Sequence, residues 1–227
     1  MTDALDTSNG ASDPTASPEP EFQVLGASAR RHAAVPTLEF EVHLAETSGR
    51  RVYVVALSTQ VMIEPARRAY DEESRARLVE LFGPPERWSM TARSLVWARV
   101  DTLVPEFTGS TTFRLPIECS YDQELVAAKY FHSLSDGEVP LAFNFNGTIY
   151  YRDDDGRLQM TLVPWRCSAE FRMSVAVWRE LIDHYYPGRG WIGLRTDTLD
   201  ALAREKARRG LPTFDACVAA LLEESGE

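Results

Sequence analysis

The chain has 227 residues, of which 44% are hydrophobic and 10% aromatic, and this composition excludes a protein that is disordered throughout. Its formal net charge of −10 at pH 7 argues against broad binding to nucleic acid or to an anionic membrane. The start of the chain does not resemble a signal peptide, and no apolar run reaches the roughly 18 residues of a membrane span, so we expect a cytoplasmic protein.

The cysteines and histidines lack the spacing of a metal site. No Cys-X-X-Cys pair occurs, and no two histidines are spaced as zinc ligands. Glycine-rich phosphate-binding motifs are also missing. We therefore predict no bound metal and no other cofactor. The cysteines and histidines considered as ligands are Cys119, Cys167, Cys217, His32, His43, His132 and His184.

The N-terminal third begins with small and polar residues and continues as a hairpin. Residues 1–21 are predicted to be a disordered acidic tail, because they carry too few large apolar side chains to offset the entropy of ordering. A short strand at 22–27 and a small, basic linker at 26–34 follow. Residues 38–44 and 52–63 alternate apolar and polar side chains around a glycine-containing turn, which predicts a β-hairpin.

The middle of the chain contains two helices and two strands. Asp71 is predicted to cap a short helix that ends at Gly83, because its carboxylate can accept hydrogen bonds from free amides of the first turn. Residues 90–104 and 111–117 read as strands, and 122–134 as a helix.

The stretch from 137 to 165 is the centre of the predicted sheet. Apolar residues at period two indicate one long strand with a single buried face, and Asp153 to Arg157 then turn the chain into a return strand. Asn146-Gly147 is also a strong hairpin signal, but we favour a continuous strand with a bulge at Gly147, because the alternation resumes on both sides.

The remaining chain is one short strand followed by helices. The strand at 169–173 precedes a helix capped by Ser174, and amphipathic helices are predicted at 197–209 and 213–224. The fold class is α+β, with an antiparallel β-sandwich-like body, short inserted helices and a C-terminal helical section. We place the sandwich-like domain at 22–173 and the helical section, packed on it, at 174–227.

Two clusters suggest chemistry but are better explained by structure. Asp153 to Asp155 could ligate calcium, yet no glutamate follows at EF-hand spacing, so an acidic hairpin turn is preferred. Cys119, Asp122 and His132 resemble a nucleophile with its base and orienting group. Ten residues of helix span about 15 Å, however, so Asp122 and His132 do not easily both reach Cys119.

The best candidate for binding is an arginine-rich region around the first helix. Basic and aromatic side chains together often form the anchors of protein interfaces. The competing explanation is a solvated helix face. We predict that a protein partner binds at Arg67, Arg68, Arg87 and Trp88.

Ala127-Ala128-Lys129-Tyr130-Phe131, Asp136-Gly137-Glu138-Val139-Pro140-Leu141 and several shorter motifs resemble segments of an uncharacterised family of actinobacterial proteins, a domain of unknown function often encoded near uptake nickel-iron hydrogenase genes. The similarity extends from about residue 22 to 206 and includes Leu81-Phe82-Gly83 and Val163-Pro164-Trp165. It implies an accessory or assembly role and transfers no catalytic residue. The other similar segments are 61–68, 87–88, 104–105, 107–109, 115–116, 121–122, 147–148, 151 and 178–179.

The sequence therefore favours a non-catalytic cytoplasmic protein-binding or assembly module, with hydrogenase as the enzyme it serves. The alternative is a hydrolase or transferase whose site is assembled only in three dimensions. A carrier of an apolar small ligand, held between the sheets, is the third hypothesis. A large pocket lined by titratable groups would favour the enzyme, whereas a filled interior would favour the binding module.

Overall fold

The structure is a computed structural model, and it describes residues 17–119, 125–188 and 193–226. The chain divides into two compact units, and their boundary in the sequence follows Gly188. The predicted tail at 1–21 lies mostly outside the described residues.

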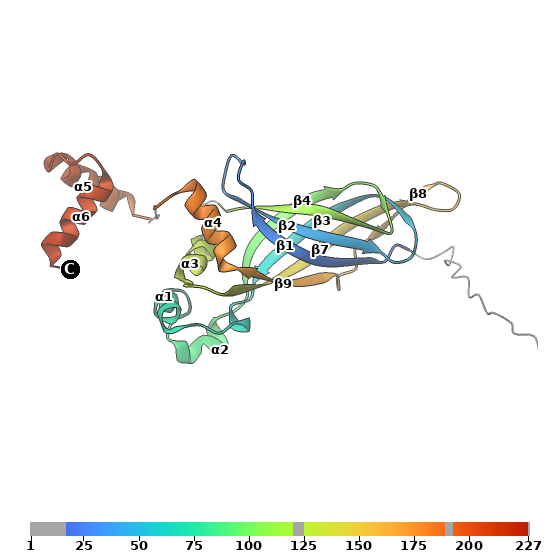
Figure 1. The fold of residues 1–227 in the computed structure, drawn as a ribbon, viewed down its shortest axis with the longest axis horizontal. Coiled ribbons are helices and arrows are strands. Elements are labelled where there is room, and N and C mark those ends of the chain that lie inside the picture. The colour runs from blue at the N-terminus through green and yellow to red at the C-terminus, as the bar shows by residue number, and fades with distance from the viewer. Residues whose placement is uncertain (1–16, 120–124, 189–192, 227) are drawn as a thin grey trace, which may run out of the picture. The chain divides into compact units, whose positions relative to one another are not determined.

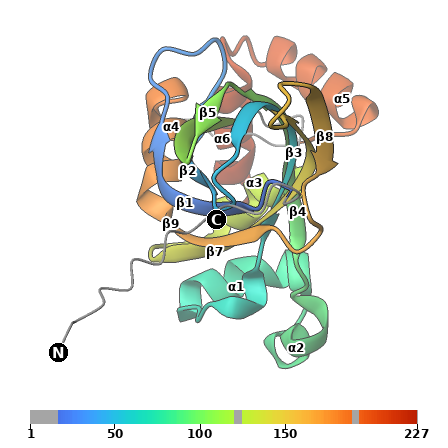
Figure 2. The same ribbon diagram turned by 90° about the vertical axis from the view of Figure 1, so that its right-hand side faces the viewer.

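The first unit is built on two antiparallel sheets, shown in Figures 1 and 2, which confirms the predicted fold class. The smaller sheet has the order β1-β2-β6, and the larger has the order β4-β3-β7-β8, with β5 paired to β3 and β9 paired to β7. The strands are β1 (Pro20–Ala29), β2 (Thr37–Glu46), β3 (Arg51–Ile63), β4 (Leu95–Val104), β5 (Phe107–Thr108), β6 (Ser110–Glu118), β7 (Glu138–Arg152), β8 (Leu158–Leu162) and β9 (Ser168–Ser174).

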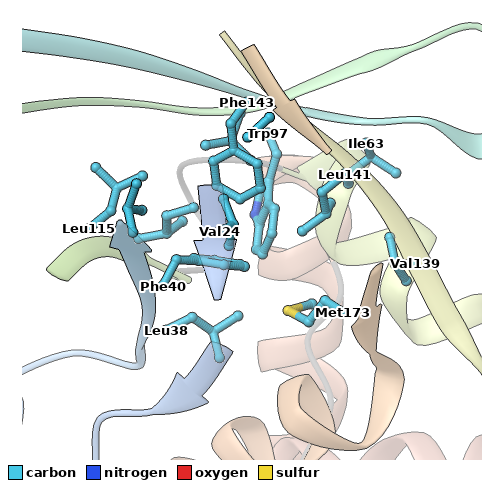
Figure 3. Close-up of a cluster of buried hydrophobic side chains, with 14 of the residues drawn as sticks. Val24, Leu38, Phe40, Ile63, Trp97, Leu115, Val139, Leu141, Phe143 and Met173 are labelled. Carbon is cyan, nitrogen blue, oxygen red and sulfur yellow. The ribbon is translucent and has the colours of Figure 1, made fainter. Parts of the chain in front are cut away.

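Apolar side chains from both sheets fill the space between them. Phe40 of β2 is fully buried, and its ring lies 5.1 Å from that of Phe143 of β7 and 6.0 Å from that of Trp97 of β4. Figure 3 shows these rings among aliphatic side chains of the core. The alternation in the sequence correctly predicted which face of β2 and β7 is buried, because every second residue of a strand points to the same side.

The central strand is continuous, as predicted, but the predicted bulge at Gly147 is wrong. Gly147 pairs with Leu57 of β3 in unbroken register, and the irregularity between these strands lies at Val52 and Val54 instead. Gly147 is needed for a different reason. A Cβ there would lie 2.1 Å from the carbonyl oxygen of Ala56, and the backbone φ is +150°. A side chain at this position would collide with the neighbouring strand.

On its other edge, β7 changes partner near Gly147. β9 pairs with β7 from Glu138 to Asn144, and β8 pairs with it from Thr148 to Arg152. The predicted acidic turn joins β7 to β8. There the amide of Gly156 donates to the Asp153 carbonyl at 2.9 Å.

Two helices of the first unit, α1 and α4, begin at capping side chains that the sequence identified. Asp71 accepts a 2.7 Å hydrogen bond from the amide of Ser74, and Ser174 accepts one of 3.2 Å from that of Ala176. The described helices are η1 (Pro65–Arg67), α1 (Glu72–Phe82), η2 (Pro85–Arg87), α2 (Trp88–Thr91), α3 (Leu125–Ser133) and α4 (Val175–Tyr185).

The predicted hairpin of residues 38–44 and 52–63 is wrong. Both strands form, but β2 pairs with β1 and β6 while β3 pairs with β4, β5 and β7, so the turn between them carries the chain from one sheet to the other.

Two predicted boundaries differ from the structure. The strand predicted from residue 90 begins at Leu95, because Met90 lies in the short helix α2. The indole of Trp88, at the start of this helix, donates a 2.8 Å hydrogen bond to the Gly83 carbonyl. The basic linker predicted from residue 26 begins later, because β1 continues to Ala29. The predicted start of the third helix at Asp122 lies outside the described residues.

The second unit contains α5 (Thr196–Arg208) and α6 (Phe214–Ser225). Arg209 links the two helices: its guanidinium donates to Glu205 at 2.5 Å and to both carboxylate oxygens of Glu224 at 2.6 and 2.8 Å. Hydrogen bonds from Arg208 and Arg209 lower the pKa of Glu205 to about 2. The described helices include none that is long and apolar enough to cross a membrane.

Gly147→Ala is expected to lower the free energy of unfolding by at least ~3 kcal/mol, because β7 and β3 must separate to admit the methyl group. Urea and thermal denaturation measure the loss. Gly26→Ala is the matched control, since a Cβ at Gly26 meets nothing within 4 Å. Equal stability of the two variants would contradict this account of Gly147.

The α5–α6 unit is expected to loosen in acid. The pKa of Glu205 is lower in the folded unit than its ordinary 4.5, so its stabilising contribution is complete above that pH and is lost as the pH falls towards 2. Amide chemical shifts of α6, followed by NMR in the full chain, should change over this range. Glu205→Gln should produce part of the change already at about pH 5; an unchanged spectrum there would contradict the prediction.

Candidate functional site

The predicted arginine surface is partly used inside the protein. Both oxygens of Glu170 on β9 accept hydrogen bonds from Arg67, at 2.7 and 3.1 Å. This pairing lowers the pKa of Glu170 and raises that of Arg67. Arg68 donates to the carbonyl of Asp136 at 2.9 Å, and its guanidinium lies over the ring of Tyr70 at 5.0 Å.

Trp88 contacts the same tyrosine. Its ring lies edge-on to Tyr70 at 5.3 Å and to Phe82 at 5.7 Å, and the side chain is half-buried. Arg87 is exposed in η2. The structure therefore brings Arg68 and Trp88 together at Tyr70, whereas Arg67 is paired with β9. That these four residues bind a partner stays a prediction.

A pair of tyrosines lies beneath this region. The hydroxyl groups of Tyr70 and Tyr130 lie 2.8 Å apart, and that of Tyr70 also donates to the carbonyl of Pro65 at 2.8 Å. Burial raises the pKa of both phenols. Both groups therefore stay protonated and serve as hydrogen-bonding groups of the core.

The other sequence candidates have structural contacts. Asp153 accepts hydrogen bonds from the side chain of Gln159 and the amide of Arg157, at 2.9 and 2.8 Å, which lowers its pKa and closes the hairpin turn. His132 packs edge-on against Trp178 at 4.8 Å, and burial lowers its pKa. Cys119 lies 3.6 Å from the carbonyl of Ile117. Asp122 lies outside the described residues.

A surface that the sequence did not reveal lies on the outward side of the large sheet. Leu103 of β4, Met160 and Leu162 of β8 are 72%, 70% and 71% exposed. The strand register places them on one face, because Leu103 pairs with Ala56, Ala56 with Thr148, and Thr148 with Leu162. We call this the outer apolar face and define it by Val54, Ala56, Leu103, Tyr150, Leu158, Met160 and Leu162.

The outer apolar face is hollowed between its projecting side chains. A depression of about 260 Å³ is lined by small residues, including Ala56, Ser58 and Gly147, with Leu103 and Asp101 beside it. Leu103 and Leu162 lie three strand spacings apart, about 14 Å. Ala56 and Thr148 lie between them. The face therefore has the form of an apolar saddle whose border carries Asp101 beside the hollow and Arg152 beside Leu158.

A larger cleft lies where β4 and β6 approach each other without pairing. Its volume is about 830 Å³, and the segment after β1 lines it together with residues of both strands. Trp97, Val100 and Ile117 provide apolar surface. The titratable groups of the lining are Arg30, His32, Arg99, Asp101 and Glu118.

Arg68→Ala is expected to lower the free energy of unfolding by about 1–2 kcal/mol, because it removes a hydrogen bond to Asp136 and the contact with Tyr70. Arg87→Ala is the control and should leave the melting temperature unchanged, since Arg87 is exposed. Differential scanning calorimetry measures both. If neither variant loses stability, Arg68 is not structural.

The comparisons with known proteins identify a family but no function. The model of a family of unknown function, DUF6084, matches residues 17–227. A search of curated proteins finds no match.

Two solved structures overlap weakly with the chain. A protein of Bordetella pertussis described as ApaA is 11% identical, with a TM-score of 0.26, over 69% of this chain and 93% of its own. A β-glucosidase of Kluyveromyces marxianus is 7% identical, with a TM-score of 0.25, over 69% of this chain and 15% of its own. Neither overlap is close enough to transfer a fold or a function. The family match covers nearly the whole chain, which therefore belongs to the family of unknown function DUF6084.

Proposed function

We propose that the protein is a non-catalytic protein-binding module whose partner docks on the outer apolar face. The observation that carries the proposal is the exposure of Leu103, Met160 and Leu162, each at least 70% accessible on well-paired strands. Scattered apolar residues are normal on a surface, but a contiguous apolar patch marks an interaction site. A preformed sheet also loses little conformational entropy when a partner binds.

The hollow in this face defines the chemistry of the partner. Its lining includes the small residues Ala56 and Gly147, so an apolar side chain of the partner can enter beside the projecting Leu103. Binding energy concentrates where such an anchor fills a pocket. Asp101 at the border favours a basic residue next to the anchor. The partner is accordingly a protein with a leucine, methionine or phenylalanine anchor and a positive charge beside it.

The identity of the partner is a further part of the proposal. The sequence resemblance implies an accessory or assembly role for an uptake nickel-iron hydrogenase, so a hydrogenase component is the first partner to test. The protein's net charge of −10 favours a partner whose docking surface is basic at its rim.

A second candidate function is supported by the 830 Å³ cleft. The volume is sufficient for a small molecule, and His32, Asp101 and Glu118 could serve as acid and base groups. This observation favours the hydrolase or transferase alternative. The third hypothesis, a ligand held between the sheets, has no such support, because the core side chains occupy that space.

Leu103→Lys should weaken partner binding at least tenfold, because a charge beside the hollow must be desolvated when the anchor enters. The partner is first purified with tagged wild-type protein, and its affinity is then measured by titration calorimetry. Leu25→Lys is the matched control, since Leu25 is 48% exposed on β1 of the other sheet. Equal binding by the Leu103 and Leu25 variants would exclude this face. Loss with Arg67→Glu plus Arg68→Glu instead would move the site to the arginine region.

A further inference from the structure

The outer edge of β8 carries a row of backbone groups that the sheet does not use. β8 is the last strand in the order of the large sheet, and it lies at that sheet's border in Figure 2. The amide of Val163 donates to the Gly147 carbonyl at 3.0 Å, and the amide of Asp153 donates to the Arg157 carbonyl at 3.0 Å. These two bonds show which residues of β8 are hydrogen-bonded to β7 and which are not.

The alternation determines which groups point away from β7. In an antiparallel pair, hydrogen-bonded and non-hydrogen-bonded positions alternate. Residues 157, 159, 161 and 163 are therefore bonded to β7, in register with residues 153, 151, 149 and 147. The amide and carbonyl groups of Leu158, Met160 and Leu162 point to the open edge. Their side chains also lie on the outer apolar face.

This edge is short, at five residues, but it lacks the other features that normally prevent edge-to-edge pairing. Natural edge strands are protected by charged side chains, proline or bulges. The segment from Leu158 to Val163 reads Leu-Gln-Met-Thr-Leu-Val and contains no charge and no proline, and its register with β7 is regular. The β7–β8 hairpin also lies at the end of the sandwich opposite to α1, α2 and α3, as Figure 1 shows.

We propose that β8 pairs antiparallel with β8 of a second copy of this chain, with Met160 at the two-fold axis. In this register Met160 faces Met160 of the second copy, and Leu158 faces Leu162. All three outward-pointing residues then fall at hydrogen-bonded positions, and about six backbone bonds join the copies. The two large sheets become one continuous sheet. This inference does not depend on the proposed binding of another protein.

A second copy fits the edge because the edge is complementary to itself. The three residues whose backbone groups point to the open edge are spaced symmetrically about Met160. A two-fold axis at Met160 therefore gives each of their amide and carbonyl groups a hydrogen-bond partner in the second copy. The acidic turn before β8 and Arg166 after it lie at opposite ends of the strand, so an antiparallel second copy brings the turn of each copy near Arg166 of the other. Asp154 of this turn is exposed, and it pairs with Arg50 of its own chain at 3.3 Å. Trp165, which is 91% exposed, adds apolar surface next to that contact. Both outer apolar faces lie on the same side of the joined sheet.

Sedimentation velocity of the full chain over a range of concentrations tests the proposal. The wild type should show a monomer–dimer equilibrium. Met160→Pro should weaken the dimer at least 100-fold, because proline lacks the amide hydrogen that faces the second copy, while the bonds to β7 stay in place. Met160→Ala keeps that amide and should stay within about tenfold of the wild type. Thermal denaturation verifies that both variants are folded.

Cysteine crosslinking tests the register and does not rely on a destabilising change. Hydrogen-bonded positions across the axis bring Cα atoms to about 5.5 Å, within the range of a disulfide. Met160→Cys should therefore form a covalent dimer under mild oxidation. Gln159→Cys, which faces residue 161 of the second copy, and the wild type with its own cysteines should form far less.

Leu103→Lys separates edge pairing from stacking of the outer apolar faces. It leaves the edge intact, so the dimer should persist even if this variant no longer binds another protein. A wild type that is monomeric at all concentrations and gives no Met160→Cys crosslink would overturn the proposal. A dimer that survives Met160→Pro but is lost in Leu103→Lys would also overturn it, in favour of face-to-face packing.

Discussion

The close approach of β7 to β3 at Gly147 is the constraint on which the large sheet depends. The two backbones come so near that a single Cβ would lie 2.1 Å from the Ala56 carbonyl oxygen. The register of the two strands is unbroken from Val54 to Ile63, on both sides of this contact. In this register Phe143, Phe145 and Ile149 point inward. The same register places Thr148 and Tyr150 on the outer side, next to the exposed side chains of β4 and β8.

Alternation and capping in the sequence were sufficient to predict most elements of the fold. The strands β2 and β3, the helix after Asp71 and the helix after Ser174 follow from patterns within a few residues. The hairpin expected of β2 and β3 was wrong, because the two strands belong to different sheets. The bulge expected at Gly147 was wrong. Glycine is required there because a side chain would collide with β3, whose paired residue Leu57 is 90 positions away in the sequence. The strand expected from Met90 was wrong at its start, because contacts of Trp88 with Tyr70 and Phe82 hold a helical turn there.

The candidate binding surface was harder to predict for a physical reason. Alternation identifies residues that share a face of a strand, but it does not say which strands are neighbours. Leu103 and Leu162 lie on the same face of one sheet because β3 and β7 join their two strands, and this strand order is not visible in the sequence. The arginine region stood out in the sequence because its residues are adjacent there. In the structure Arg67 and Arg68 hold η1 against β9 and the segment after α3, and that internal use is invisible in a linear pattern.

The partnering of β3 with β7 also governs when the chain can fold. Val55 and Ile149 are paired although 94 positions separate them in the sequence. β6 likewise pairs with β2, although β3, β4 and two α-helices lie between them in the sequence. A topology dominated by such distant contacts folds in milliseconds to seconds rather than microseconds. During synthesis β4 can pair with one edge of β3 after it emerges, whereas the other edge stays unpaired until β7 follows. The nascent chain therefore exposes an apolar strand until most of the protein has left the ribosome, and this interval is when a chaperone has most to protect.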